Sequence, residues 1–224
     1  MYPASLHDGE QTLPRPSSER PRVFVVDDDI SMRESLESLI RCVGWQAESF
    51  ASAEEFLAHP RDSVPGCLVL DYCLPQLDGL GLQKRIAADE ALLPIVFITC
   101  YGDPRMAVQA MKAGALEILS KPFGDDEILG AIRQGIARSQ SALLRHAELG
   151  RLRQSYATLS PRERQIMALV VSGRLNKQIA RELQISEITV KAHRGRVMRK
   201  MKSDSLAELV NMAIKLDREA LTEP

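Results

Sequence analysis

In the first part of the chain, short runs of strand-forming residues alternate with helical patterns. Five runs predict β-strands, at residues 22–26, 46–50, 67–70, 95–99 and 116–119. Between and after them, apolar residues recur every three or four positions, which predicts helices beginning near residues 31, 52, 80, 106 and 125. Apolar strands that alternate with helices indicate a parallel sheet covered by helices on both faces.

The last third of the chain shows only helical spacing. Ser160 opens the sequence Ser-Pro-Arg-Glu, which is typical of a capped helix start. Gly173 ends that helix, and we expect Asn176 to cap a second helix and Ser186 a third. A fourth helix begins near Asp204. The second and third helices are joined by a short turn and the third is rich in Lys and Arg, which favours a helix-turn-helix DNA-binding unit.

These patterns divide the chain into four parts. We expect a disordered tail at 1–20, rich in Pro and Ser, and an α/β domain at 21–139. A helical linker follows at 140–158, which either sets the spacing between the domains, helps to form a dimer, or is a plain tether. An all-α domain occupies residues 159–224.

Charge supports this division. Residues 21–143 hold 11 Lys and Arg against 18 Asp and Glu, a balance of −7, whereas residues 144–224 hold 16 against 9, a balance of +7. A basic second half indicates an anionic partner such as nucleic acid. The four cysteines lack metal-site spacing, and the sequence has neither a membrane-length apolar run nor an apolar signal region, so we expect a cytoplasmic protein.

Polar residues follow the predicted strands where the strands end. The carboxyl ends of parallel strands meet at one edge of a sheet, where ligands bind. The residues at this edge are Asp27, Asp28, Asp29, Asp71, Thr99 and Lys121. Asp29 is also a natural helix cap. Grouped carboxylates hold a proton or bind a cation, and oxygen ligands without His favour Mg²⁺ or Mn²⁺.

This set of residues suits phosphoryl transfer. A carboxylate such as Asp71 is able to act as the nucleophile and become an aspartyl phosphate. Lys121 would neutralise the charge that develops on the phosphoryl group, and Thr99 would donate a hydrogen bond to one of its oxygens.

The segments "VVDDD", "LVLDYCLPQLDGL", "FITCYGD" and "LSKPF" resemble the four signatures of bacterial response-regulator receiver domains over residues 22–138. The resemblance implies a flavodoxin-like sheet of order 2-1-3-4-5 and a Lys121–Pro122 peptide in the cis form. It implies Asp71 as phospho-acceptor and Thr99 and Lys121 as switch residues. It also implies a Mg²⁺ site formed by Asp27, Asp28, Asp71 and the backbone carbonyl of Cys73.

Two features depart from the receiver pattern. Ile118 stands three residues before the lysine, where the family usually has an aromatic residue, so signalling through an aromatic rotamer is not expected. Cys73 and Cys100 lie on the loops of the site. Packing or chance is the favoured interpretation of these thiols, and a redox input is the alternative.

The stretch "LSPRERQIMALVVSGRLNKQIARELQISEITVKAHRGRVMRKM" resembles the four-helix output domain of the LuxR/FixJ/NarL family over residues 159–214. The implied recognition helix is Glu187–Met201, in which His193 is expected to be packed and hydrogen-bonded. Arg194 or Arg196 is expected to read guanine. The implied major-groove residues are Lys191, Ala192, Arg194, Gly195 and Arg196. The implied phosphate contacts are Asn176, Lys177, Thr189 and Arg199.

The combined prediction is a response regulator that is not an enzyme. The expected partners are a sensor histidine kinase, double-stranded promoter DNA, RNA polymerase and, after phosphorylation, a second copy of the chain; no membrane is expected. Its expected effect on transcription is activation. One rival is a DNA-binding protein whose receiver is only a scaffold. The other is a phosphatase of the haloacid-dehalogenase type. Such phosphatases have a substrate cap, which this chain lacks.

Overall fold

The computed structural model describes residues 20–75, 77–87, 93–100 and 104–220. The chain divides into two compact units, residues 1–143 and 144–224, called here the N-terminal and C-terminal units. The predicted disordered tail lies outside the described residues except for Arg20, and so does the "YGD" of the third receiver signature. Among the described helices, none is long and apolar enough to cross a membrane.

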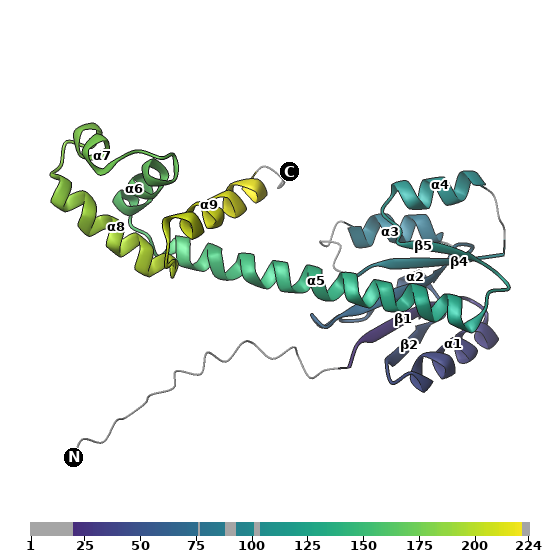
Figure 1. Cartoon of the computed structure of the whole chain (residues 1–224). Coiled ribbons are helices and arrows are strands. Elements are labelled where there is room, and N and C mark those ends of the chain that lie inside the picture. The colour runs from purple at the N-terminus through teal and green to yellow at the C-terminus, as the bar shows by residue number, and fades with distance from the viewer. Residues whose placement is uncertain (1–19, 76, 88–92, 101–103, 221–224) are drawn as a thin grey trace, which may run out of the picture. The chain divides into compact units, whose positions relative to one another are not determined.

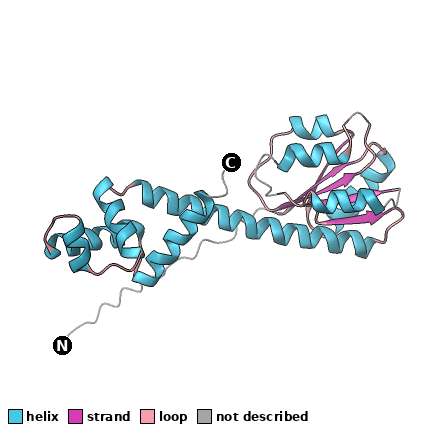
Figure 2. Ribbon diagram, turned by 90° about the horizontal axis from the view of Figure 1, so that it is seen from above, coloured by secondary structure: helices cyan, strands magenta, loops and turns pink. Residues whose placement is uncertain are grey.

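The N-terminal unit is an α/β domain (Figures 1 and 2). Its strands form one parallel sheet of order β2-β1-β3-β4-β5, as predicted. Its elements are β1 (Arg22–Val26), α1 (Ile30–Cys42), β2 (Gln46–Phe50), α2 (Ala53–Ala58), β3 (Gly66–Asp71), α3 (Gly79–Ala87), β4 (Ile95–Thr99), α4 (Pro104–Lys112), β5 (Glu117–Ser120) and the first part of α5 (Asp125–Ala157).

Two hydrophobic cores cover the two faces of this sheet. Alternate residues of β1 show the division, because Val23 and Val25 belong to one core and Phe24 and Val26 to the other. The first core packs against α1 and α5, and the second against α2, α3 and α4. The central strand β3 is buried along its whole length. This explains why it reads in the sequence as an unbroken apolar run that ends at Asp71.

Helix ends in this unit follow local chemistry. The Asp29 carboxylate accepts the Ser31 amide at the start of α1. Ser52 caps α2 through the Glu55 amide, but the Glu55 carboxylate accepts the Ala51 amide and not that of Ser52. The start of α2 therefore has a Ser52 cap but not a reciprocal capping box.

The C-terminal unit is all-helical. After the last part of α5 come α6 (Pro161–Val171), α7 (Asn176–Glu182), α8 (Glu187–Met201) and α9 (Leu206–Ala220). Its core includes Ile166, Ile179, Val190, Val197 and Met201. The last three are spaced along one face of α8, which is its buried side.

Hydrogen bonds at the helix starts explain most boundaries of the C-terminal unit. Ser160 and Glu163 form the predicted capping box of α6, and Ser186 caps α8. The prediction for α7 was wrong: Leu175 holds the cap position and Asn176 is the first helical residue. The Leu175 amide is satisfied instead by the side chain of Gln178.

Candidate functional sites

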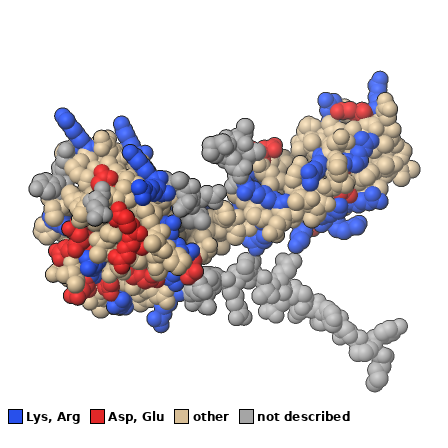
Figure 3. All heavy atoms as spheres, turned by 180° about the vertical axis from the view of Figure 1, so that it is seen from behind, with Lys and Arg blue, Asp and Glu red and all other residues tan. Residues whose placement is uncertain are grey.

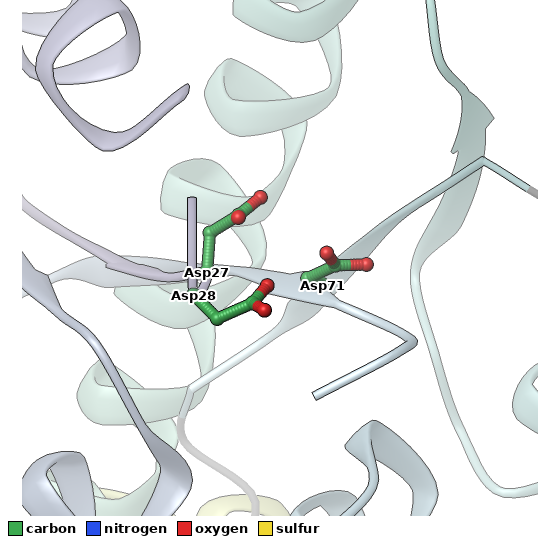
Figure 4. A group of neighbouring side chains, drawn as sticks. All are labelled: Asp27, Asp28 and Asp71. Carbon is green, nitrogen blue, oxygen red and sulfur yellow. The ribbon is translucent and has the colours of Figure 1, made fainter. Parts of the chain in front are cut away.

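Three carboxylates meet at the carboxyl edge of the sheet (Figure 4). Asp27 and Asp28 follow β1, and Asp71 is the last residue of β3. One oxygen of each lies within 4.8 Å of the others. Asp27 and Asp71 are buried, and Asp28 is exposed. A site that is buried on one side and open at Asp28 can admit an ion from solvent.

Lys121 joins the two buried acids. Its ammonium donates to Asp27 Oδ2 at 2.8 Å and to Asp71 Oδ2 at 3.0 Å. It follows β5, and its backbone amide donates to the carbonyl of Thr99 at 2.7 Å. Thr99 itself is buried at the end of β4. The structure thus brings together the acids, the hydroxyl and the amine that sequence reasoning placed at this edge, and the Lys121–Pro122 peptide is cis.

Backbone contacts fix the orientation of the acids. The amide of Asp29 donates to Asp27 Oδ1 at 2.8 Å, and the amide of Cys73 donates to Asp71 Oδ1 at 3.1 Å. Arg33 of α1 donates to the carbonyls of Asp27 and Asp28 at 2.8 and 3.0 Å. Sequence reasoning missed Arg33, because its partners are backbone carbonyls and not the acidic side chains.

Charge and burial oppose each other in this site. Burial raises the pKa of Asp27 above its ordinary value, although hydrogen bonds from Lys121 and the Asp29 amide act in the other direction. Burial disfavours the charged Lys121, but hydrogen bonds to Asp27 and Asp71 outweigh it and hold its pKa above the ordinary value. The acids therefore gain from a neighbouring cation, and Lys121 supplies one.

The donor set fits a hard divalent cation. The three grouped ligands are carboxylate oxygens, and no His or Cys thiol of the described residues joins the group. Oxygen donors in this number suit Mg²⁺, which usually keeps some of its waters. The acidic pocket is thus of the kind that holds Mg²⁺ in receiver domains.

The two departures from the receiver pattern concern Ile118 and the cysteines Cys73 and Cys100. Both cysteines are exposed, so the packing expected of their thiols is not found. Ile118 is half-buried and packs against the core shared by α3 and α4. Cys67 is fully buried, and burial raises its pKa to about 12. Although Cys73 is exposed, partial desolvation of its thiol and the charge of Asp71 hold the pKa of Cys73 above its ordinary value. This disfavours the reactive thiolate and weighs against a redox input at Cys73.

The helix α8 carries most of the residues predicted to contact DNA. Six predicted residues are exposed: Lys177, Lys191, Ala192, Gly195, Arg196 and Arg199. Three are half-buried: Asn176, Thr189 and Arg194. In Figure 3, Lys and Arg outnumber Asp and Glu on the visible face of the C-terminal unit, while acidic side chains gather on that of the N-terminal unit.

Two of the half-buried residues hold each other. Asn176 Oδ1 accepts a hydrogen bond from Arg194 Nη1 at 2.6 Å, so α7 positions an arginine of α8. Neither the sequence spacing nor the residue types revealed this pair, because the two residues lie 18 positions apart. Asn176 therefore orients a predicted base-reading side chain.

Lys200 and His193 differ from expectation. Lys200 is one of the basic residues of α8 expected to point away from its buried face, but its ammonium pairs with the buried Glu163 at 2.7 Å. It thereby ties α8 to the start of α6. His193 is half-buried as expected, but its Nδ1 is buried without a hydrogen-bond partner among the described residues. The hydrogen bond predicted for His193 is not found at that atom.

Comparison with known proteins agrees with this geometry. Residues 23–133 match the family model described as response regulator receiver domain, and residues 157–213 match the model described as bacterial regulatory proteins, luxR family. The chain belongs to the two-component response regulators that combine a receiver with a LuxR-type helix-turn-helix output domain. It is therefore a DNA-binding transcription regulator, not a phosphatase.

Individual relatives cover nearly the whole chain. Nodulation protein W of Bradyrhizobium diazoefficiens is 47% identical over 88% of this chain and 87% of its own. Response regulator protein TodT of Pseudomonas putida is 42% identical over 92% and 91%. The solved structure of the response regulator StyR is 45% identical, with a TM-score of 0.78, and covers 88% of this chain and 100% of its own.

Proposed function

We propose that Asp71 accepts a phosphoryl group from a sensor histidine kinase and that this modification controls DNA binding by α8. The observation that carries the proposal is the placement of Lys121 within hydrogen-bond distance of both Asp27 and Asp71. Such an ammonium is suited to the added charge of an acyl phosphate. In the transfer, an Asp71 oxygen forms a bond to phosphorus as the bond to the donor nitrogen breaks.

The other residues of the site have supporting roles in this proposal. Asp27, Asp28, Asp71 and the Cys73 carbonyl would hold Mg²⁺, which when bound offsets charge on the phosphoryl oxygens. Thr99, at the end of β4, would donate to a phosphoryl oxygen. Lys121 would release Asp71 and keep Asp27. These exchanges are local and electrostatic, and they bias the receiver toward a second conformation.

The proposal assigns the four parts of the chain as the sequence suggests. The tail is 1–20, the receiver 21–139, the linker 140–158 and the DNA-binding domain 159–224. The chain would act in the cytoplasm, bind promoter DNA as a dimer after phosphorylation, and activate transcription with RNA polymerase. Two groups of residues would contact DNA in this proposal. The base sequence would be specified in the major groove by Lys191, Ala192, Arg194, Gly195 and Arg196. The phosphates would be contacted by Asn176, Lys177, Thr189 and Arg199.

Intact-mass spectrometry after incubation with acetyl phosphate and Mg²⁺ tests the site. We expect one phosphoryl adduct on the native chain, none on Asp71→Asn, and none after a chelator removes the metal. Asp126→Asn, which makes the same change at an exposed acid of α5, is the matched control and is expected to keep the adduct. An adduct of equal yield on Asp71→Asn would show that another residue is the acceptor.

A further inference from the structure

Ile188 is an exposed aliphatic residue at the start of the recognition helix. It is the second residue of α8 and is 80% exposed, more than any other large hydrophobic residue that the structure describes. The other large aliphatic residues of this helix, Val190 and Val197, are buried in the domain core. Ile188 therefore does nothing for the packing of its own domain. A lone exposed aliphatic residue is unremarkable elsewhere, so its position on this helix matters.

Ile188 lies on the face of α8 that points away from the core. Steps of four, three and four residues place Ile188, Ala192, Gly195 and Arg199 along one stripe of the helix surface. All four are exposed, whereas the buried residues of α8 lie on the opposite side. A Cβ added at Gly195 would meet no described atom within 4 Å, so packing inside the domain does not require this glycine. The first three residues of the stripe, Ile188, Ala192 and Gly195, are thus apolar or small, and Arg199 ends it.

Basic residues flank this stripe. Lys191 and Arg196 are exposed on either side of it, and Arg194 is held by Asn176. In a DNA groove, the negative phosphates lie along the edges and the base edges form the floor. A helix that is basic at its sides and apolar along the first part of its centre matches that distribution. The amino-terminal residues of a recognition helix are the ones that contact base edges.

Among the base edges of the major groove, thymine alone presents a methyl group. We propose that Ile188 is a specificity-determining residue that packs against the C5-methyl group of a thymine in the operator. This inference rests on the proposed use of α8 in the major groove. It adds a base preference that hydrogen-bonding residues such as Arg194 do not supply.

Removal of single methyl groups from DNA tests the inference. The full chain, with and without acetyl phosphate and Mg²⁺, is used to select duplexes from a random library at fixed salt. Each thymine of the selected site is then replaced in turn by deoxyuridine, which lacks only the methyl group. Affinities are measured for the native chain, Ile188→Ser, Ile188→Val, and Leu206→Ser as a control at an exposed leucine of α9.

We expect one thymine in each half-site at which deoxyuridine weakens binding by the native chain about fourfold, as burial of one methyl group implies. Ile188→Val and Leu206→Ser should keep this penalty, since both retain an aliphatic side chain at position 188. Ile188→Ser should lose it and bind the two duplexes equally. Unchanged helical circular dichroism would show that the variants remain folded.

The outcomes separate this inference from the function on which it rests. If selection enriches no sequence under either condition, both the DNA-binding proposal and the inference fail. If a site is enriched but every deoxyuridine duplex binds as well as its thymine parent, DNA binding stands and the inference is wrong. A penalty that persists in Ile188→Ser would assign methyl recognition to another residue.

Discussion

The two units carry their functional residues in opposite ways. In the N-terminal unit, residues from the ends of β1, β3, β4 and β5 converge, and Asp27, Asp71 and Thr99 are buried. In the C-terminal unit, most predicted contact residues lie on the single helix α8 and six of the nine are exposed. In the first site the charges of the acids are paired within the protein by Lys121. The basic residues of the second site face solvent and are expected to pair with DNA.

This contrast shows which substitutions should affect stability and which should affect binding. A buried, charge-paired site is coupled to the fold, so removing one member leaves the others unpaired. An exposed helix face contributes little to its own domain, so its residues are free to serve recognition. Glu163 and Lys200 are the exception in the C-terminal unit, because the buried Glu163 carboxylate is paired with the half-exposed Lys200 ammonium.

The largest expected effect comes from removing the cation of the buried site. Lys121→Met leaves Asp27 and Asp71 unpaired and should destabilise the N-terminal unit by about 3–5 kcal/mol in a chelator. Added Mg²⁺ should restore part of this loss, since it supplies the missing charge. Urea unfolding followed by the fluorescence of Trp45, the single tryptophan and a residue of the N-terminal unit, measures it.

Lys112→Met is the matched control for that experiment. Lys112 is exposed at the end of α4, so its loss should change stability little and should add no dependence on Mg²⁺. Equal stability of Lys121→Met and the native chain without metal would show that the buried acids do not need the ammonium. The contrast between the two units would then fail.

A second prediction concerns the contact of α5 with the sheet. A Cβ at Gly135 would lie 2.5 Å from Cys67 Sγ, whereas one at Gly130 of the same helix would meet no described atom within 4 Å. Gly135→Ala should therefore cost about 1–3 kcal/mol, and Gly130→Ala should add about 1 kcal/mol. Trp45, which packs against the same core as Cys67, reports both changes.

Combination with Cys67→Ala tests the cause of the Gly135 effect. Removing the sulfur removes the nearest clash, so the double variant should be more stable than the sum of the single changes predicts. Additive losses would mean that Gly135 is needed for some reason other than close packing. Either result concerns the receiver core and leaves α8 unaffected.

A third prediction uses the ion pair of the C-terminal unit. Hydrogen bonds from Lys200 and the Ser160 amide lower the pKa of Glu163 from 4.5 to about 2. Because the folded pKa is the lower one, the ionised carboxylate stabilises this unit fully above pH 4.5, and the benefit disappears as the pH falls toward 2. Glu163→Gln should be less stable than the native chain above pH 4.5 and equally stable near pH 2.

Thermal unfolding followed by far-UV circular dichroism across this pH range measures the difference, while Trp45 fluorescence identifies unfolding of the N-terminal unit. Glu182→Gln, at an exposed residue of α7, is the control and should match the native chain throughout. A stability gap between Glu163→Gln and the native chain that is independent of pH would show that the loss is one of packing and not of charge.

The smallest expected effect is at Asn176. Asn176→Ala frees Arg194, and ordering that side chain again on DNA costs about 0.5–1.5 kcal/mol, which is roughly a two- to tenfold loss of affinity. The salt dependence should not change, because no charge is removed. Lys177→Ala, next in the chain, should instead reduce the slope of affinity against salt. A reduced slope in Asn176→Ala would contradict the orienting role.

The sequence predicted the strands and the edge residues well for identifiable reasons. The strands β1, β2 and β4 were placed to the residue, and β3 is an apolar run because both of its sheet faces are buried. Parallel topology then sends Asp27, Asp71 and Lys121 to one edge whatever their partners. Family motifs supplied the roles, which the strand pattern alone did not.

Side-chain pairings were beyond the sequence. In the sequence Asn176 has the character of a helix cap, but in the structure it accepts a hydrogen bond from Arg194. Lys200 has the character of a surface lysine, but it forms an ion pair with the buried Glu163. Each pairing depends on the packing of α8 against α6 or α7, which helical periodicity does not specify. Arg33 of α1 was missed for a different reason: its partners are the backbone carbonyls of Asp27 and Asp28, which residue types do not reveal.

The most direct test of the account is the DNA affinity of the full chain for its selected duplex, measured at fixed salt before and after acetyl phosphate with Mg²⁺. The account predicts that affinity rises on modification, by roughly 5- to 150-fold if the coupling is of the usual size, and that Asp71→Asn shows no rise. An unchanged affinity in the native chain, or an equal rise in Asp71→Asn, would contradict control of DNA binding through Asp71.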